Sequence, residues 1–289
     1  MSAAPVVVPQ SVEDLLLPIL ERLENKDFDL PPLPQVANQV LALTTDPNAH
    51  AARLTGLIQQ DPVLTSKIFQ TANSAACGAQ RQIDSLHQAI AWLGLNHVAG
   101  AAFTLSVQSG VFNTSGYETE VKELWKQALA TGFCAKTIAG QIGKNQDTAF
   151  LCGLLHSIGK PFIVHTVNLY QEKDSAPIPW TSILWLIKEA YVEVGRQLGD
   201  AWELPDPVKE TINLHQDHAF HLAQSPSFGA PITCLANHLV THFLAGEERD
   251  EAALFNLPIV KFLKIPEEDM TYLLGQKETL HAEAENMLV

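Results

Sequence analysis

Three side chains with evident chemical potential lie close together in the sequence: the imidazole of His156, the hydroxyl of Ser157 and the ammonium of Lys160. They follow an apolar run, and the apolar positions 151, 154, 155 and 158 recur at helical spacing. This pattern predicts a buried helix that ends near Gly159, where a following cation such as Lys160 is favoured. An unpartnered buried polar group costs about 1–3 kcal/mol. Three such groups on an apolar helix therefore indicate that the helix lines a cavity.

His156 has two interpretations. A single histidine on an apolar helix is more often a hydrogen-bonded core residue than a metal ligand. However, His215 and His218 occur further along the chain, and His238 and His242 are four residues apart, which places both rings on one side of a helix. That spacing suits two imidazoles on one metal ion. The structural alternative remains open, because the glutamate of the zinc-protease motif is absent and histidines near a helix end often face solvent or carbonyls.

Covalent catalysis has little support in the sequence. His156 and Ser157 are adjacent, so on a helix their side chains point apart and cannot form a Ser–His pair. No Gly-x-Ser-x-Gly elbow, Walker A loop or Gly-x-Gly-x-x-Gly motif occurs. Glu189 and Glu193 could be read as paired carboxylates, but a solvated helix face is the simpler interpretation.

The charge balance excludes several classes of partner. The 289-residue chain has 18 Lys and Arg against 32 Asp and Glu, a net charge of −14, which disfavours nucleic-acid backbones and anionic membranes. No segment approaches about 18 consecutive apolar residues, and the N-terminus lacks the basic region of a signal peptide. The 4 cysteines form no Cys-x-x-Cys pair and predict reduced, buried thiols. We therefore expect a cytoplasmic protein that binds neither nucleic acid nor membrane.

The elements that must position these residues are all predicted to be helices. Apolar residues recur at helical spacing, and no strand-like alternation occurs. The predicted helices cover residues 11–24, 35–44, 50–60, 62–73, 83–93, 96–112, 118–142, 181–202, 208–214, 232–244 and 267–280. The loop-like cluster at residues 113–116 predicts a boundary. The sequence thus predicts an all-α fold with an N-terminal helix in residues 1–27 and two helical subdomains, residues 28–113 and 117–289.

Residues 153–160, Gly-Leu-Leu-His-Ser-Ile-Gly-Lys, resemble the His-Asp motif region of the HD phosphohydrolase superfamily. The upstream half carries Leu-Pro at 33–34, Ile-Gln-Gln-Asp-Pro at 58–62, Ala-Asn-Ser at 72–74 and Ala-Ile-Ala-Trp-Leu-Gly at 89–94. In that order these segments are similar to the HDOD family, the HD-related output domain of bacterial signalling proteins, over residues 28–245. The resemblance implies a multi-helical, HD-like bundle with an N-terminal helical part.

The resemblance also implies a metal site, from which this sequence departs. In active HD enzymes, histidines and aspartates hold one or two divalent metal ions that activate water against a phosphoester. At the matching positions this sequence has Gln127, His156, Ser157, Tyr191, His215 followed by Gln216, and Asn237. Neutral side chains at Ser157 and Asn237 replace two carboxylates, and a hard divalent ion loses most of its binding free energy without them. The expectation is a polar pocket, with Lys160 also on its floor, that has no catalytic residue and no metal.

Three functions are compatible with this pattern. The first is a non-enzymatic signalling module that binds a protein partner or a small ligand, through the groove between its two helical parts or the surface of the N-terminal bundle. The alternative is a metal-dependent phosphohydrolase with a rearranged site built from His156, His215, His218, His238 and His242. The third is an assembly scaffold, which predicts a stable oligomer. The oligomeric state stays open.

Overall fold

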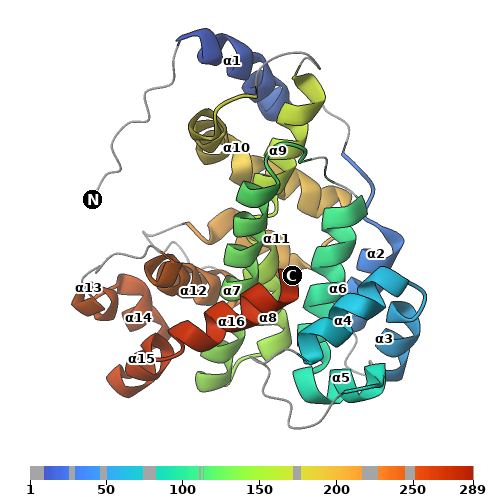
Figure 1. The fold of residues 1–289 in the computed structure, drawn as a ribbon. Helices are drawn as coiled ribbons and strands as arrows, with labels where there is room; N and C mark the ends of the chain where they lie inside the picture. Colours follow the sequence, from blue (N-terminus) through green and yellow to red (C-terminus); the bar gives the residue numbers. More distant parts are fainter. Residues whose placement is uncertain are drawn as a thin grey trace.

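The computed structural model describes residues 10–25, 30–45, 51–73, 83–110, 112, 114–171, 177–216, 227–244 and 251–288. All regular secondary structure in these residues is helical (Figure 1). This confirms the predicted all-α fold. Most predicted helices occur within a few residues of their expected bounds, because their apolar stripes are buried in one common core.

The first half of the chain is a helical bundle. In it, the helix that begins at Gln35 packs on the helix that begins at Leu95. The Asp-Pro helix start is present: Asp61 Oδ1 accepts a hydrogen bond from the Leu64 N–H at 3.0 Å. Asn73 closes the following connection, because its side chain exchanges two hydrogen bonds with the backbone of Ile83, at 2.8 and 2.9 Å. The helices are α1 (Gln10–Asn25), α2 (Gln35–Thr45), α3 (Ala51–Ile58), α4 (Pro62–Ala72), α5 (Leu86–Leu93) and α6 (Leu95–Gly110).

The second half is arranged around its long first helix, α7, which packs against α8, α12 and α16. Helices α9 and α10 lie against each other, and α11 contacts α8, α10 and α12. The helices are α7 (Glu118–Gln141), α8 (Gln146–Leu155), α9 (Gly159–Tyr170), α10 (Trp180–Ala201), α11 (Asp206–Leu214), α12 (Gly229–Leu244), α13 (Glu251–Phe255), α14 (Pro258–Leu263), α15 (Glu267–Leu274) and α16 (Lys277–Leu288).

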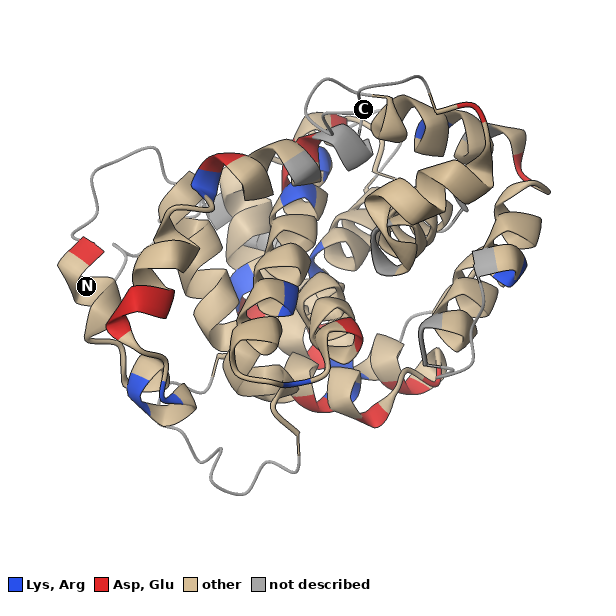
Figure 2. Cartoon of the chain, turned by 90° about the horizontal axis from the view of Figure 1, so that it is seen from below, with Lys and Arg blue, Asp and Glu red and all other residues tan. Residues whose placement is uncertain are grey.

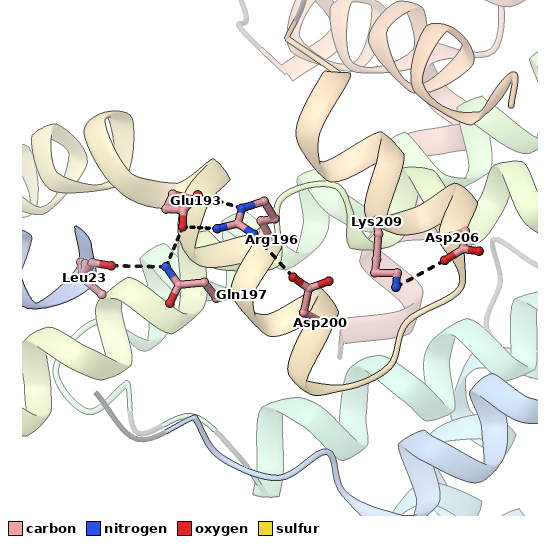
Figure 3. A network of polar contacts seen from close by, with 7 residues as sticks. All are labelled: Leu23, Glu193, Arg196, Gln197, Asp200, Asp206 and Lys209. Atoms are coloured by element: carbon pink, nitrogen blue, oxygen red, sulfur yellow. Dashed lines mark hydrogen bonds and ion pairs between the residues drawn. The ribbon is translucent and has the colours of Figure 1, made fainter. Parts of the chain in front are cut away.

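The two ends of the chain tie the halves together. Helix α1 packs on α9 and α10, and Gln197 on α10 donates a hydrogen bond to the carbonyl of Leu23 at 3.4 Å (Figure 3). Helix α16 packs on α7 and also reaches α4 and α6, and Lys126 on α7 forms an ion pair with Glu285 at 2.9 Å. One hydrophobic core runs through both halves. The division at residue 113 therefore stays a prediction about subdomains.

Two predicted helix boundaries are wrong. The central helix ends at Leu155, and Gly159 begins α9 instead of terminating α8. Gly159 is needed for packing: a Cβ there would lie 2.1 Å from the carbonyl oxygen of Tyr191 on α10. Lys160 consequently lies in the first turn of a helix, where the helix dipole disfavours a cation. The predicted helix 267–280 is also divided, between α15 and α16, at Gly275.

Apolar length alone does not make a membrane span here. Residues Gln146–Tyr170 are long and apolar enough to cross a bilayer, but 89% of the apolar window is buried inside the protein. Basic and acidic residues are interspersed along the described helices seen from below, without a continuous basic stripe in that view (Figure 2). Cytoplasmic location stays a prediction.

Candidate functional site

The turn between α8 and α9 brings His156 and Ser157 into the interior of the second half. The N–H of Ile158 donates to the Leu155 carbonyl at 3.2 Å, and the N–H of Lys160 donates to the Ser157 carbonyl at 2.9 Å. Both His156 and Ser157 are buried. Glycines permit the close approach of the neighbouring helices, since a Cβ at Gly153 would lie 2.7 Å from the backbone of α7. The local sequence thus folds into a tight turn that is enclosed by α7, α10 and α12.

His156 is a neutral ring held by the backbone. Its Nδ1 lies 2.6 Å from the carbonyl oxygen of Gly153. A carbonyl only accepts, so Nδ1 carries the proton and Nε2 is left without one. Burial, together with the charges of His215 and Lys160, holds the pKa of His156 well below its usual range. The ring therefore stays uncharged at neutral pH.

A second chain of hydrogen bonds runs through His215. Its Nδ1 lies 3.0 Å from the carbonyl oxygens of both Thr211 and Ile212, and its Nε2 lies 2.9 Å from the hydroxyl of Tyr191. Gln216 donates from its amide to the same hydroxyl. Both nitrogens of His215 are thereby occupied: Nδ1 donates to the carbonyls, and Nε2 accepts from Tyr191. Burial raises the pKa of Tyr191, which remains a phenol.

The amides predicted to replace metal ligands form a parallel chain. Gln127 on α7 donates to the side-chain oxygen of Asn237 on α12 at 3.5 Å, and Asn237 also hydrogen-bonds the side chain of His156. The His156 and His215 rings meet edge to face with their centroids 5.0 Å apart. The structure therefore brings together residues from four helices, α7, α9, α10 and α12, and from the turns that follow α8 and α11. We call this group the polar cluster: Gln127, His156, Ser157, Lys160, Tyr191, His215, Gln216 and Asn237.

Lys160 is the single cation of the polar cluster. Its Nζ lies 5.1 Å from the centroid of the Tyr191 ring, and burial lowers its pKa to about 8. No carboxylate pairs with it among the described residues. In an active metal site this region would be negative, whereas here its only formal charge is positive.

The other candidate histidines do not join the polar cluster in the described structure. His242 Nε2 lies 3.8 Å from Glu251 Oε1, which is a contact between α12 and α13. His238 is partly buried on α12, one residue beyond Asn237. His218 lies outside the described residues. Glu193, considered above as half of a carboxylate pair with Glu189, instead pairs with Arg196 and accepts from Gln197 (Figure 3).

These donors do not fit a divalent metal ion. Within the described ranges, no group of three or more His, Cys, Asp or Glu side chains is arranged to hold one. Both nitrogens of His215 are engaged in hydrogen bonds, and His156 is bonded to Gly153 and Asn237. Binding a cation would require breaking these bonds beside the charge of Lys160 without any carboxylate to compensate. We derive no metal-dependent step for this site.

Sequence reasoning missed how the glycines build the polar cluster. Gly159 and Gly153 lie where a side chain would collide with the backbone of a neighbouring helix. A glycine inside a helical pattern costs about 0.5–1 kcal/mol relative to alanine, so an internal glycine is itself a signal of close packing. That signal was present at both positions. The hydrogen bond between Tyr191 and His215 had no equivalent local signal.

A family model for the HDOD domain matches residues 30–218, nearly two thirds of the sequence. The chain belongs to the HDOD family. The match begins after α1 and ends before α12, so the HDOD residues include His156, Tyr191 and His215 but not Asn237.

Solved structures have the same fold as this HDOD chain. An HDOD domain protein of unknown function from Geobacter sulfurreducens superposes with a TM-score of 0.66 at 21% identity, covering 95% of this chain and 98% of that one. A provisionally described phosphohydrolase from Shewanella amazonensis SB2B superposes with a TM-score of 0.67 at 18% identity, covering 94% of this chain and 98% of that one. A provisionally described signal transduction protein from Marinobacter aquaeolei VT8 superposes with a TM-score of 0.64 at 21% identity, covering 96% of this chain and 66% of that one. At these identities the likeness shows a shared fold.

A sequence relative extends beyond the length of this HDOD chain. An uncharacterized protein from Treponema pallidum (strain Nichols) is 25% identical over 298 residues, which cover 97% of this chain and 55% of the relative. The chain thus spans about half the length of that relative.

Proposed function

We propose that this HDOD protein is a non-enzymatic signalling module that acts by binding a partner. The observation that carries the proposal is the composition of the polar cluster. Apart from the Lys160 ammonium its groups are neutral, and Gln127, His156, Tyr191, His215, Gln216 and Asn237 are hydrogen-bonded to one another or to backbone carbonyls. Metal-assisted hydrolysis needs a cation that lowers the pKa of a bound water. Such a cation is held by carboxylates or by several imidazole nitrogens, and both nitrogens of His215 are already hydrogen-bonded.

The polar cluster can still serve the module as a fixed structural core. Half-buried Gln127 and Asn237 link α7 to α12, and buried Tyr191 and His215 link α10 to the end of α11. Fully paired buried networks favour one packing arrangement over others. A binding module benefits from such rigidity, because a surface that is already ordered loses less conformational entropy when it binds.

Metal content and turnover provide the direct test. Protein purified without chelators should contain far less than one Mn, Ni, Mg or Fe per chain, and it should not hydrolyse a panel of nucleotides and phosphodiesters supplied with these ions. His156→Ala should leave that baseline unchanged, as should His281→Ala, a matched control at an exposed histidine on α16. Stoichiometric metal with turnover that is lost in His156→Ala alone would replace this proposal with a rearranged phosphohydrolase.

A further inference from the structure

An open groove of about 690 Å³ lies between the two halves of the molecule, away from the polar cluster. We call it the α2–α10 groove. One wall comes from the extended segment 30–34 and α2, and the other from the end of α10 and the turn into α11. Its volume lies within the range of about 300–1,000 Å³ that is typical of ligand sites. The lining residues are Pro32, Leu33, Asn38, Leu41, Ala42, Ala201, Trp202, Glu203 and Pro205.

The two walls of the groove are held at a fixed separation. Trp202 Nε1 donates a hydrogen bond to the carbonyl of Pro31 at 2.8 Å, which links α10 directly to the extended segment. The Trp202 ring also stacks on Phe112, with ring centroids 6.3 Å apart and planes 20° apart. The backbone of the extended segment is stiffened by prolines. The groove is therefore preformed, which reduces the entropic cost of filling it.

One carboxylate at the rim of the groove has no ion-pair partner among the described residues. Three acidic residues lie at the end of α10 and the start of α11. Asp200 pairs with Arg196 at 3.5 Å, and Asp206 pairs with Lys209 at 3.3 Å (Figure 3). Glu203 lies between them, is exposed and lines the groove, yet no Lys, Arg or His of the described chain pairs with it. A groove of mixed polar and apolar lining thus carries one negative charge that no cation of the described residues neutralises.

The backbone at Glu203 is also unusual. Its φ is +51°, in the left-handed region, where a residue other than glycine pays roughly 1–2 kcal/mol. The turn is nevertheless fixed, because Glu203 N–H donates to the Asp200 carbonyl at 3.1 Å and Leu204 N–H to the Gly199 carbonyl at 2.9 Å. Strained residues of this kind concentrate at binding and catalytic sites.

We propose that the α2–α10 groove binds the partner, and that the partner presents a peptide segment with one Lys or Arg flanked by apolar residues. The cation would pair with Glu203, while the apolar side chains occupy the surface formed by Pro32, Leu33 and Pro205. Charge complementarity acts locally, through Glu203, and at long range. The whole chain has a net charge of −14, which attracts cationic segments before contact. This inference rests on the proposed function and names the partner's chemistry.

Selection of phage-displayed random dodecapeptides on the full-length protein tests the inference. Selected peptides should contain a Lys or Arg next to apolar residues, and fluorescence anisotropy should show affinity that weakens as salt rises. Glu203→Gln should weaken binding about tenfold, and Ala42→Arg, which fills the groove from an exposed position on α2, should abolish it. Glu189→Gln, a matched control at an exposed carboxylate on α10, should leave binding unchanged.

Several outcomes would overturn the inference. These are a failure to select any peptide, selected peptides without a cation, or affinities that are equal in wild type, Glu203→Gln and Ala42→Arg. Circular dichroism of each variant separates lost binding from lost folding. Failure here is distinguishable from failure of the proposed function, because the latter would appear as metal content with phosphoester turnover.

Discussion

The polar cluster and the α2–α10 groove differ in how their polar and charged groups are paired and exposed. In the polar cluster, neutral donors and acceptors pair with one another, and the only formal charge, on Lys160, is enclosed and has its pKa lowered to about 8. In the groove, polar and apolar surfaces are mixed, and the carboxylate of Glu203 is exposed and has no ion-pair partner among the described residues. A ligand would have to break existing bonds in the first region, whereas it would satisfy an unpaired group in the second.

The comparison teaches that two regions of one fold can leave very different groups available to a ligand. Most residues of the polar cluster are hydrogen-bonded to one another or to the backbone, so they stabilise the fold. The groove proposed for recognition lies where the two halves meet, and its lining includes none of those residues. Mutations in the two regions should therefore affect different properties: stability in the first, binding in the second.

The largest effect is expected at the close contact that supports the polar cluster. Gly159→Ala would place a Cβ 2.1 Å from the Tyr191 carbonyl oxygen, and both atoms belong to rigid helices. We expect the free energy of unfolding to fall by about 3 kcal/mol, measured by urea denaturation. Gly56→Ala in α3 is the control, since its Cβ meets nothing within 4 Å, and it should stabilise by about 0.5–1 kcal/mol. Equal effects at the two glycines would remove close packing as the cause.

Removing the enclosed cation should stabilise the protein. Burial lowers the pKa of Lys160 from 10.5 to about 8, so below pH 8 the folded state carries a charge that it disfavours. Lys160→Met should raise the free energy of unfolding by about 2 kcal/mol at pH 7, after allowance for its partial exposure and the lost contact with Tyr191.

The difference in unfolding free energy between Lys160→Met and wild type should depend on pH. Between about pH 8 and 10.5 the unfolded chain keeps the Lys160 proton while the folded state has released it, so wild-type stability rises relative to the variant. The advantage of Lys160→Met should shrink over that interval in urea titrations. Lys188→Met, at an exposed lysine on α10, should change little. A variant less stable than wild type at pH 7 would show that the ammonium has a stabilising partner.

Acid should lower the free energy of unfolding, because His156 is buried as a neutral ring. Its pKa in the fold lies well below the usual 6.5, so below pH 6.5 the unfolded state binds a proton that the folded state does not. Stability should therefore fall with decreasing pH, with a contribution of about 1.4 kcal/mol per pH unit from this residue. His156→Gln should show a shallower fall between about pH 6.5 and 5 in thermal or urea unfolding. Equal slopes in both proteins would mean that His156 is charged in the fold.

The smallest expected effect on stability lies in the groove. Glu203→Gly relieves a left-handed backbone and should raise the free energy of unfolding by about 0.5–1 kcal/mol, measured as an increase in Tm. Lys264→Gly, at the other described non-glycine residue with positive φ, should behave similarly. The two variants should differ in peptide binding, which only Glu203→Gly should weaken. Loss of stability in both would indicate that the left-handed backbone is not strained.

Much of the fold could be predicted from helical periodicity, because an apolar stripe of period 3.6 is a local property of the chain. The Asp61-Pro62 helix start and the long helix from residue 118 are examples. The prediction was wrong at Gly159, where a residue that commonly ends helices instead lets two helices touch. Glycine is common both at helix ends and at close contacts between helices. Which of the two applies at a given position depends on the neighbouring helix.

The sequence by itself determined the helical pattern and the chemical character of each side chain, because periodicity and residue identity are local properties. Only the tertiary structure decided how those side chains are satisfied and where the open surface lies. The contacts responsible join residues far apart in the chain: 24 positions separate Tyr191 from His215, and 171 separate Pro31 from Trp202. Local patterns carry no information on such pairings, because packing of the whole core sets them.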